Sequence, residues 1–301
     1  MRRILLPTDF SPHANAALSH ALKFAHAYGG EIHLFHVQMP LGPTSPLIDE
    51  YPDDSEARAA LTQIDTGGIV DVRQMRRGVT IGPTIVDYAD EQDIDLIVMG
   101  SHGRRGVPRL LMGSVAEEVV RSAECPVLVV HGDAGGDDAL KYDRLLVPVD
   151  FSPLTEDQLE TAAEMAKRFS SKIELVHAID PPTMPDFYMP AGTFVLDMRR
   201  VTETVYERLG ALAEPLEEDL DVTTKVLAGR AAKEVARRSK HADLVVIPTH
   251  GHTGLDRALL GSVAESVIRR SACPVMVLPA DRSHFLRDEE EIAGDSTEAY
   301  A

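Results

Sequence analysis

The chain has 301 residues, of which 44% are hydrophobic and 26% are charged, and its formal net charge is −18. This acidity argues against a nucleic-acid binder and against adhesion to anionic membrane surfaces, because both need clustered lysines and arginines. No apolar run approaches the roughly 18 residues of a membrane span, and the 2 cysteines have no CxxC spacing, so the sequence predicts a cytoplasmic protein.

The first half alternates strand and helix patterns. In chain order the sequence predicts a strand at Arg3–Pro7, a helix at Ala14–Ala27, a strand at Glu31–Val37, a helix near Ser55–Ile64, a strand at Ile69–Met75, a helix at Pro83–Gln92, a strand at Ile94–Met99, a helix at Ser114–Arg121 and a strand at Pro126–Val130. Because the strands are nearly all apolar and separated by helices, a parallel sheet covered on both faces is expected.

The second half repeats the first. RILLPTDFSP at 3–12 returns as RLLVPVDFSP at 144–153, GSVAE at 113–117 returns at 261–265, and CPV at 125–127 returns at 273–275. Separate matches in the same order indicate two homologous domains. The second copy differs in a longer loop at Asp180–Leu196 and a longer helix near Asp197–Leu216.

These patterns divide the chain into a first domain at 1–131, a linker at 132–142, a second domain at 143–280 and an acidic tail at 281–301. The linker is rich in Gly and Asp, and the polar tail is expected to be disordered or loosely attached. The predicted fold class is α/β. It consists of two doubly wound five-stranded parallel sheets, each in the order 3-2-1-4-5, related by a pseudo-two-fold axis.

The last strand of each half predicts how the halves meet. Val127–Val130 and Val275–Leu278 are short, apolar and at one edge of their sheets in that order. Exposed apolar edges favour pairing, and the repeat supplies a partner in the same chain. We therefore expect the two strands to pair antiparallel and to make the sheets continuous or nearly so.

A candidate anion site follows the strands of the first half. Asp9 comes after the first strand, GSHG at 100–103 follows the fourth, and Gly113-Ser114 opens the next helix. Glycines let backbone amides approach an anion, and a helix amino terminus favours phosphate. The Ser114 hydroxyl can add a hydrogen bond, and Arg104, Arg105 or Arg109 can add charge. The alternative is that Ser114 is simply an N-cap residue.

The pattern Gly-x-x-Gly, nine residues, Gly-Ser resembles the nucleotide loop of universal stress proteins. The resemblance extends to the strand-ending Asp9, to CPV at 125–127 and to the tandem layout. It implies that Pro7 and Asp9 line the adenine–ribose end, that the Val37 backbone meets the adenine edge, and that the loop holds ribose and phosphates. The implied contacts are Pro7, Thr8, Asp9, Val37, Gly100, Ser101, His102, Gly103, Arg104, Gly113, Ser114 and Val115.

The second copy departs from this pattern. Its matching positions are Pro148, Asp150, Ala178, Gly251, Gly261, Ser262 and Val263. Pro248, however, replaces the first glycine of the loop. Because proline lacks an N–H and fixes φ, one amide donor is lost. The sequence therefore predicts about one tight nucleotide site per chain.

Other chemistries find little support. The Walker A, dinucleotide-binding and G-x-S-x-G patterns are absent from the sequence. Asp9 and Asp150 are the obvious candidates for a metal or base role, but contact with ribose or a turn cap is the preferred interpretation. His102, His250 and His252 match no zinc spacing. We predict no catalytic residues and no protein-held metal.

The resemblance implies an adenine-nucleotide-binding stress-response protein that acts through contacts with an unidentified protein partner. ATP or AMP is the expected ligand, and Mg²⁺ is a further candidate with ATP. The first alternative is a slow ATPase or phosphotransferase that uses the same site. The second is a dimerisation scaffold that has lost nucleotide. A homodimer is a further candidate assembly.

Overall fold

The computed structural model describes residues 1–40, 53–101, 112–131, 140–180, 193–250 and 260–280. The first half contains β1 (Arg3–Pro7), α1 (Pro12–Tyr28), β2 (Glu31–Gln38), α2 (Ser55–Gln63), β3 (Asp71–Arg77), α3 (Ile81–Glu91), β4 (Leu96–Gly100), α4 (Ser114–Ser122) and β5 (Val127–Val130). The second half contains β6 (Arg144–Pro148), α5 (Thr155–Phe169), β7 (Lys172–Ile179), α6 (Thr193–Ala213), β8 (Val222–Ala228), α7 (Ala231–Arg238), β9 (Leu244–Pro248), α8 (Ser262–Arg270) and β10 (Val275–Leu278). A short 3-10 turn at Ser239–His241 follows α7.

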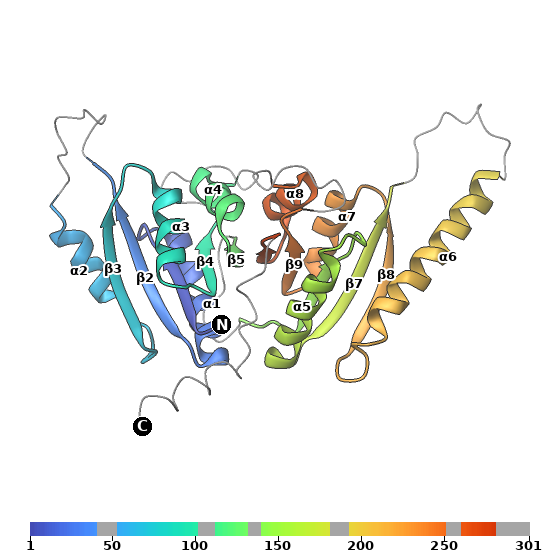
Figure 1. Ribbon diagram of the computed structural model, residues 1–301, viewed down its shortest axis with the longest axis horizontal. Helices are drawn as coiled ribbons and strands as arrows, with labels where there is room; N and C mark the ends of the chain where they lie inside the picture. The colour runs from blue at the N-terminus through green and yellow to red at the C-terminus, as the bar shows by residue number, and fades with distance from the viewer. Residues whose placement is uncertain (41–52, 102–111, 132–139, 181–192, 251–259, 281–301) are drawn as a thin grey trace, which may run out of the picture.

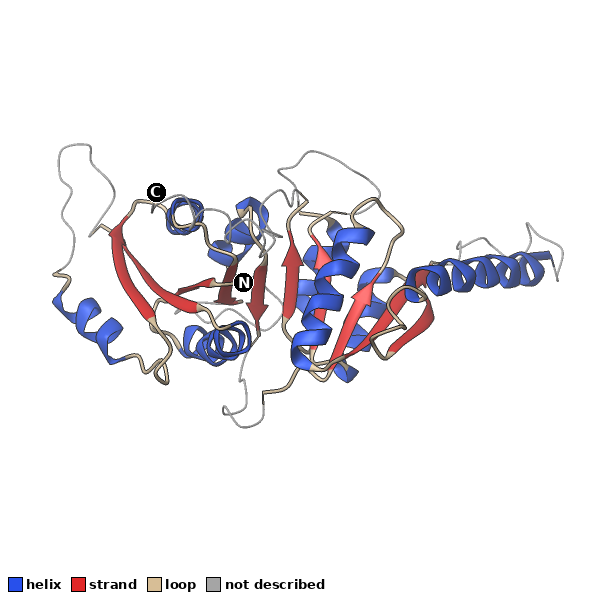
Figure 2. Ribbon diagram, turned by 60° about the horizontal axis from the view of Figure 1, so that its bottom comes forward, coloured by secondary structure: helices blue, strands red, loops and turns tan. Residues whose placement is uncertain are grey.

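The strands form one ten-stranded sheet in the order β3-β2-β1-β4-β5-β10-β9-β6-β7-β8. Each half therefore has the predicted 3-2-1-4-5 order and is parallel throughout (Figures 1 and 2). β5 and β10 pair antiparallel, with Val129 opposite Val275, Leu128 opposite Met276 and Val127 opposite Val277. The expected edge pairing is confirmed, and the two predicted sheets are halves of one sheet.

Both faces of the sheet carry a hydrophobic core that crosses the boundary between the halves. On one face α1, α2, α5 and α6 cover residues such as Leu6, Leu34 and Val147. On the other face α3, α4, α7 and α8 cover residues such as Leu5, Val129 and Val275. The halves therefore share two continuous cores, one on each face, rather than one core per domain.

Aromatic side chains join the halves on the α1–α5 face. Tyr142 is the last residue of the predicted linker, is fully buried, and packs edge-on against Phe24 and Phe169 at centroid distances of 5.4 and 5.1 Å. Its hydroxyl lies 2.5 Å from Nδ1 of the buried His20 on α1. On the opposite face Arg269 of α8 forms an ion pair with Glu117 of α4 at 3.5 Å.

Most predicted element boundaries lie within two residues of those observed, and the differences have local causes. α1 begins at Pro12 because the Ser11 hydroxyl caps it by accepting from the Ala14 N–H. β3 begins at Asp71 rather than Ile69, because the Ile69 N–H bonds back to the Thr66 carbonyl in a turn. α6 begins at Thr193, so the predicted loop at Asp180–Leu196 is too long by its last residues.

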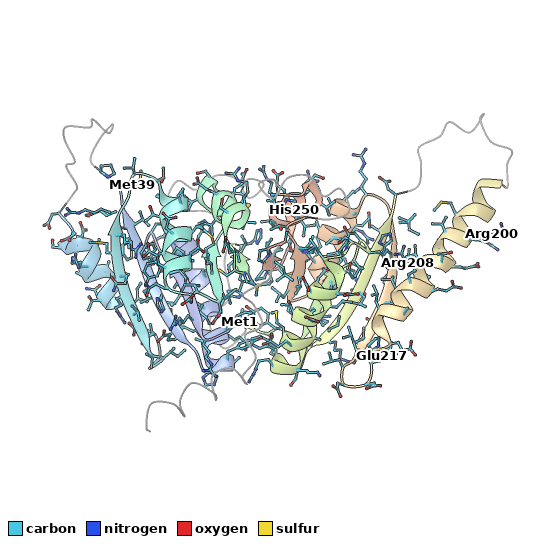
Figure 3. The ribbon with its side chains drawn as sticks, viewed as in Figure 1. Met1, Met39, Arg200, Arg208, Glu217 and His250 are labelled. Carbon is cyan, nitrogen blue, oxygen red and sulfur yellow. The ribbon has the colours of Figure 1, made fainter. Side chains whose placement is uncertain are left out.

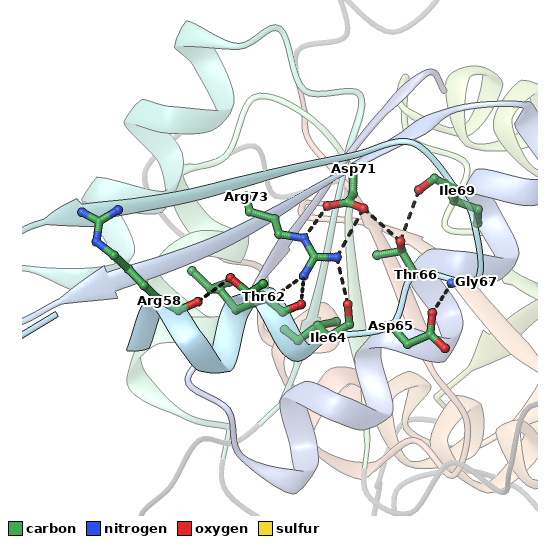
Figure 4. Close-up of polar contacts among 10 residues, drawn as sticks. Arg58, Thr62, Ile64, Asp65, Thr66, Gly67, Ile69, Asp71 and Arg73 are labelled. Carbon is green, nitrogen blue, oxygen red and sulfur yellow. Dashed lines mark hydrogen bonds and ion pairs between the residues drawn. The ribbon is translucent and has the colours of Figure 1, made fainter. Parts of the chain in front are cut away.

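The side chain of Arg73 on β3 caps the carboxyl-terminal end of α2. Its guanidinium donates to the carbonyl oxygens of Leu61, Thr62 and Ile64 at 2.5, 2.6 and 2.9 Å, and pairs with the Asp71 carboxylate at 2.5 Å (Figure 4). The last carbonyls of a helix have no partner within the helix, so this cation fastens α2 to the sheet edge.

In the described part of the chain, no helix is long and apolar enough to cross a membrane.

Candidate functional site

The candidate residues of the first half gather where β1 and β4 separate. The two strands pair only at Ile4–Leu96 and Leu5–Ile97. β1 then continues beside β2, and β4 continues beside β5. This is the point at which the winding of the sheet reverses, and ligands of doubly wound sheets bind beyond the strand ends at such a point.

Asp9 lies in a tight turn after β1. Its Oδ1 accepts a hydrogen bond from the Ser11 N–H at 3.0 Å, and the Thr8 hydroxyl accepts from the Phe10 N–H at 3.0 Å. Phe10 has a φ of +62°, a left-handed conformation that is uncommon for a residue with a side chain. Two side-chain hydrogen bonds and one strained residue thus hold the Asp9 carboxylate at the strand end.

His36 on β2 supports this turn and was missed by the sequence analysis. Its Nδ1 donates to the Thr8 carbonyl oxygen at 2.8 Å, and its ring lies 4.7 Å from the Phe10 ring between centroids. The second half repeats the arrangement, with His177 Nδ1 2.7 Å from the Val149 oxygen and 4.7 Å from Phe151. The repeat could have pointed to these histidines, because His36 and His177 stand at equivalent positions of the two copies.

Gly100 and Ser101 carry the chain out of β4. A Cβ built on Gly100 would lie 2.8 Å from the His13 carbonyl oxygen, so the first turn of α1 requires glycine here. The Ser101 N–H donates to Val130 on β5, and the Ser101 carbonyl accepts from the Gly113 N–H, both at 2.8 Å. This last bond closes the loop between β4 and α4. The predicted contacts His102, Gly103 and Arg104, and also Arg105 and Arg109, lie outside the described residues.

The amino terminus of α4 differs from the alternative interpretation of Ser114. Gly113 is the N-cap residue, with φ −65° and ψ 145°, and it has no side chain with which to cap the helix. Ser114 is the first helical residue and is exposed. The first-turn N–H groups of α4 therefore have no side-chain partner at the cap, and the positive end of the helix dipole faces the loop.

The remaining predicted contacts of the first half lie nearby but are less exposed. Pro7 is half-buried at the end of β1, and Val115 is half-buried on α4. Val37 is 8% exposed and is followed by one more strand residue, so it lies inside β2 rather than at its end. Because its side chain is buried, Val37 can contact a ligand in the candidate site only through its backbone.

The second half reproduces the frame of the site. Asp150 Oδ1 accepts from the Ser152 N–H at 2.9 Å, Phe151 has a φ of +62°, and the Gly261 N–H donates to the Thr249 oxygen at 2.8 Å. A Cβ on Gly261 would lie 2.9 Å from that same oxygen, so a close backbone approach requires glycine. Ser262 and Val263 are exposed at the start of α8, Pro148 and Ala178 are half-buried, and Gly251 lies outside the described residues.

Pro248 is the last residue of β9 and occupies the position of Gly100. The Thr249 N–H donates to Leu278 on β10, and alternate strand residues face opposite neighbours, so the nitrogen of Pro248 faces β6. β6 and β9 pair only at Leu145–Leu244 and Leu146–Val245 and have separated at this point. A proline is therefore tolerated in a central strand, and the amide that it removes is one that would face the crevice.

Neither cysteine is placed for nucleophilic chemistry. Burial raises the pKa of Cys125 to about 12 and that of Cys273 to about 11, so both stay thiols at neutral pH. Within the described ranges, no three His, Cys, Asp or Glu side chains are arranged to hold a metal ion. His250 lies beside α8, near the middle of the molecule in the view of Figure 3, and its Nδ1 is 3.0 Å from the Thr249 hydroxyl.

Comparisons with known proteins agree on one family. The model of the universal stress protein family matches twice, at residues 1–131 and 141–279. A universal stress protein of Mycolicibacterium smegmatis is 29% identical over 294 residues, which cover 91% of this chain and 96% of that protein. The universal stress protein Rv2005c of Mycobacterium tuberculosis is 33% identical over 195 residues, which are 65% of this chain and only 64% of that protein. A universal stress protein structure from Archaeoglobus fulgidus has a TM-score of 0.63 at 25% identity and covers 92% of this chain and 95% of that chain.

Proposed function

Because the chain belongs to the universal stress protein family, with two copies of the family domain, we propose that its first half binds an adenine nucleotide, ATP or AMP. The observation that carries this proposal is the meeting of Asp9, Ser101 and Gly113 around the crevice between β1 and β4. A doubly wound sheet binds ligands at this place, and the three residues come from separate segments of the chain.

Each part of the nucleotide finds a suitable group there. The Asp9 carboxylate, fixed by Ser11, can accept hydrogen bonds from ribose hydroxyls. The first-turn amides of α4, which no side chain caps, can donate to phosphate oxygens. The apolar ends of β1 and β2 suit a purine face. In a chain with net charge −18, backbone amides offer anion binding without a cluster of cations.

The same geometry favours binding over rapid turnover. Phosphoryl transfer needs an in-line nucleophile, a base and metal ligands, and the described residues contain no group of three His, Cys, Asp or Glu side chains arranged to hold a metal ion. Mg²⁺ would enter with the phosphates of ATP, with Asp9 as the candidate protein ligand. We propose a cytoplasmic regulatory protein whose contacts with a protein partner depend on bound nucleotide. The slow ATPase remains the second candidate.

The test begins with the purified protein. Denaturing it and analysing the supernatant by absorbance and mass spectrometry should reveal co-purified adenine nucleotide. Calorimetric titration of nucleotide-free protein with ATP and with AMP should then give a saturable site. Steady-state phosphate release with Mg²⁺ distinguishes a regulator from an ATPase. Absence of both bound and titratable nucleotide would favour the scaffold alternative.

A further inference from the structure

The second crevice contains a side chain that the first lacks. Gln158 on α5 is 1% exposed, and its Nε2 donates to the carbonyl oxygens of Pro148 and Val246, both at 2.9 Å. Because both partners are acceptors, the nitrogen of the carboxamide must face them. One side chain thus joins the end of β6 to β9.

These two carbonyl groups face the gap between the strands. The Val149 N–H donates to β7, so its neighbour Pro148 faces β9. The Thr249 N–H donates to β10, so Val246, three residues earlier, faces β6. The ladder between β6 and β9 has ended at Leu146–Val245. Gln158 therefore replaces the missing ladder bonds and bridges the strands where they separate.

The first half cannot make this bridge. The repeat offset of 3–12 to 144–153 places Ala17 of α1 at the position of Gln158. Ala17 is fully buried and has no polar side-chain atom, so the ends of β1 and β4 have no carboxamide between them. Pro248, like Gln158, makes the second crevice less suited to an anion, because it removes the crevice-facing amide that Gly100 offers in the first half.

We propose that Gln158 closes the second crevice and, with Pro248, restricts nucleotide to the first half. Gln158 is thus a specificity-determining residue that acts by holding β6 and β9 together, not by touching the ligand. This inference rests on the proposed function, because it assigns the same ligand to one of two related crevices.

One observation favours the opposite outcome. The hydroxyls of Ser152 and Thr155, at the start of α5, are buried and have no hydrogen-bond partner among the described residues, whereas Ser11 in the first half accepts from the Ala14 N–H. Unsatisfied hydroxyls are costly, so a ligand that reached the start of α5 would offset this cost. Counting the nucleotides bound per chain decides between the two.

The experiment is calorimetric titration of the full chain with ATP. The wild type and Pro248→Gly should each bind about one ATP, because Gln158 still bridges the strands in that variant. The double variant Pro248→Gly/Gln158→Met should approach two, since methionine keeps the length of the side chain and removes both N–H groups. Two sites in the wild type or in Pro248→Gly alone, or one site in the folded double variant, would overturn the proposal.

A reciprocal pair of variants tests the same idea in the first half and does not depend on the folding of any Gln158 variant. Ala17→Gln should weaken ATP binding at least about tenfold by bridging β1 and β4, while Ala17→Met, of similar size, should weaken it much less. Equal effects of the two substitutions would mean that bulk, not the carboxamide, matters, and would contradict the proposed role.

Hydrogen exchange separates failure of this inference from failure of the proposed function. Gln158→Met should raise the exchange rates of the Val149 and Thr249 amides at least about tenfold without any nucleotide present. If the wild type binds no ATP but these rates rise, the proposed function fails and the bridge stands. If the rates are unchanged in the folded variant, Gln158 does not close the crevice.

Discussion

At the scale of single residues, the two halves keep the residues that fix the backbone turns and differ in residues around the crevice. Phe10 and Phe151 have the same φ of +62°, and a histidine from the next strand supports each turn. Around this frame Gly100 becomes Pro248 and Ala17 becomes Gln158. Shared turns with different crevice residues agree with the proposal that both copies fold alike and that only the first binds nucleotide.

Gly113 provides the most direct test of the proposed site. Gly113→Val should abolish detectable ATP binding, because its side chain would stand where a phosphate approaches the first-turn amides of α4. The observed φ of −65° is open to valine, so the variant should fold. Calorimetry measures the affinity. Gly210→Val on α6, where a Cβ meets no atom within 4 Å, is the matched control, and unchanged affinity in Gly113→Val would misplace the site.

His20 makes the stability of the interface between the halves depend on pH. Burial, and to a smaller extent the charge of Lys23, lowers the pKa of His20 from 6.5 to about 4. Between these values the unfolded chain binds a proton that the folded chain does not. The free energy of unfolding should therefore fall as the pH drops from about 6.5 to about 4, by up to about 3 kcal/mol, and this contribution is fully present above that window.

The His20→Gln variant isolates this contribution, because glutamine does not titrate and can still reach the Tyr142 hydroxyl. Urea denaturation at about pH 7.5 and about pH 4.5 should show that the wild type loses more stability than the variant, by roughly 2 kcal/mol. Equal losses in both proteins would show that His20 does not titrate in this window.

At the scale of elements, the sequence predicts what depends on local pattern. Apolar runs gave the strands to within two residues, and the repeat gave the second half from the first. Contacts between distant segments were not predictable in this way. Nothing in the pattern around Arg73 shows that it would reach the end of α2, and Gln158 reads as an ordinary helix residue until β6 and β9 lie beside it. For the candidate site, the sequence pattern pointed to the strand ends and Gly113 but not to His36, whose contacts with Thr8 and Phe10 depend on the pairing of β1 with β2.

Arg73 should stabilise α2 more than any surface ion pair on that helix. Arg73→Met removes the guanidinium donor from the carbonyls of Leu61, Thr62 and Ile64, and should lower the free energy of unfolding by about 1–3 kcal/mol. Chemical denaturation measures the loss, and hydrogen exchange should rise first in α2. Arg58→Met removes only an exposed pair with Asp54 and should change little. Similar effects of the two substitutions would contradict the capping role.

At the scale of the whole molecule, the tandem repeat removes one sheet edge from each half. β5 and β10 face each other in a register centred on Leu128 and Met276, and helices from both halves cover the joint on both faces. The outer edges, β3 and β8, carry charged residues such as Arg77 and Lys225, which discourage further pairing. The amino-terminal part of α6 reaches past the β8 edge (Figure 1). Further along α6, the Cζ of Arg208 lies 4.0 Å from the centroid of the Phe151 ring (Figure 3 labels Arg208).

Val129 tests whether this joint holds the halves together. It is fully buried and lies opposite Val275, so Val129→Asp places a carboxylate among buried apolar side chains. Burying an unpaired charge costs several kcal/mol, and the strand pair can avoid that cost by separating. We therefore expect a larger radius of gyration in small-angle scattering and a melting temperature lower by at least about 6 °C.

ATP affinity should stay within about threefold of the wild type, because the crevice between β1 and β4 lies outside the joint. Val70→Asp, at a position that is 68% exposed, supplies the charge without the burial and should change neither quantity. An unchanged radius together with full stability in Val129→Asp would mean that the aromatic contacts around Tyr142 and the covering helices hold the halves without β5 and β10.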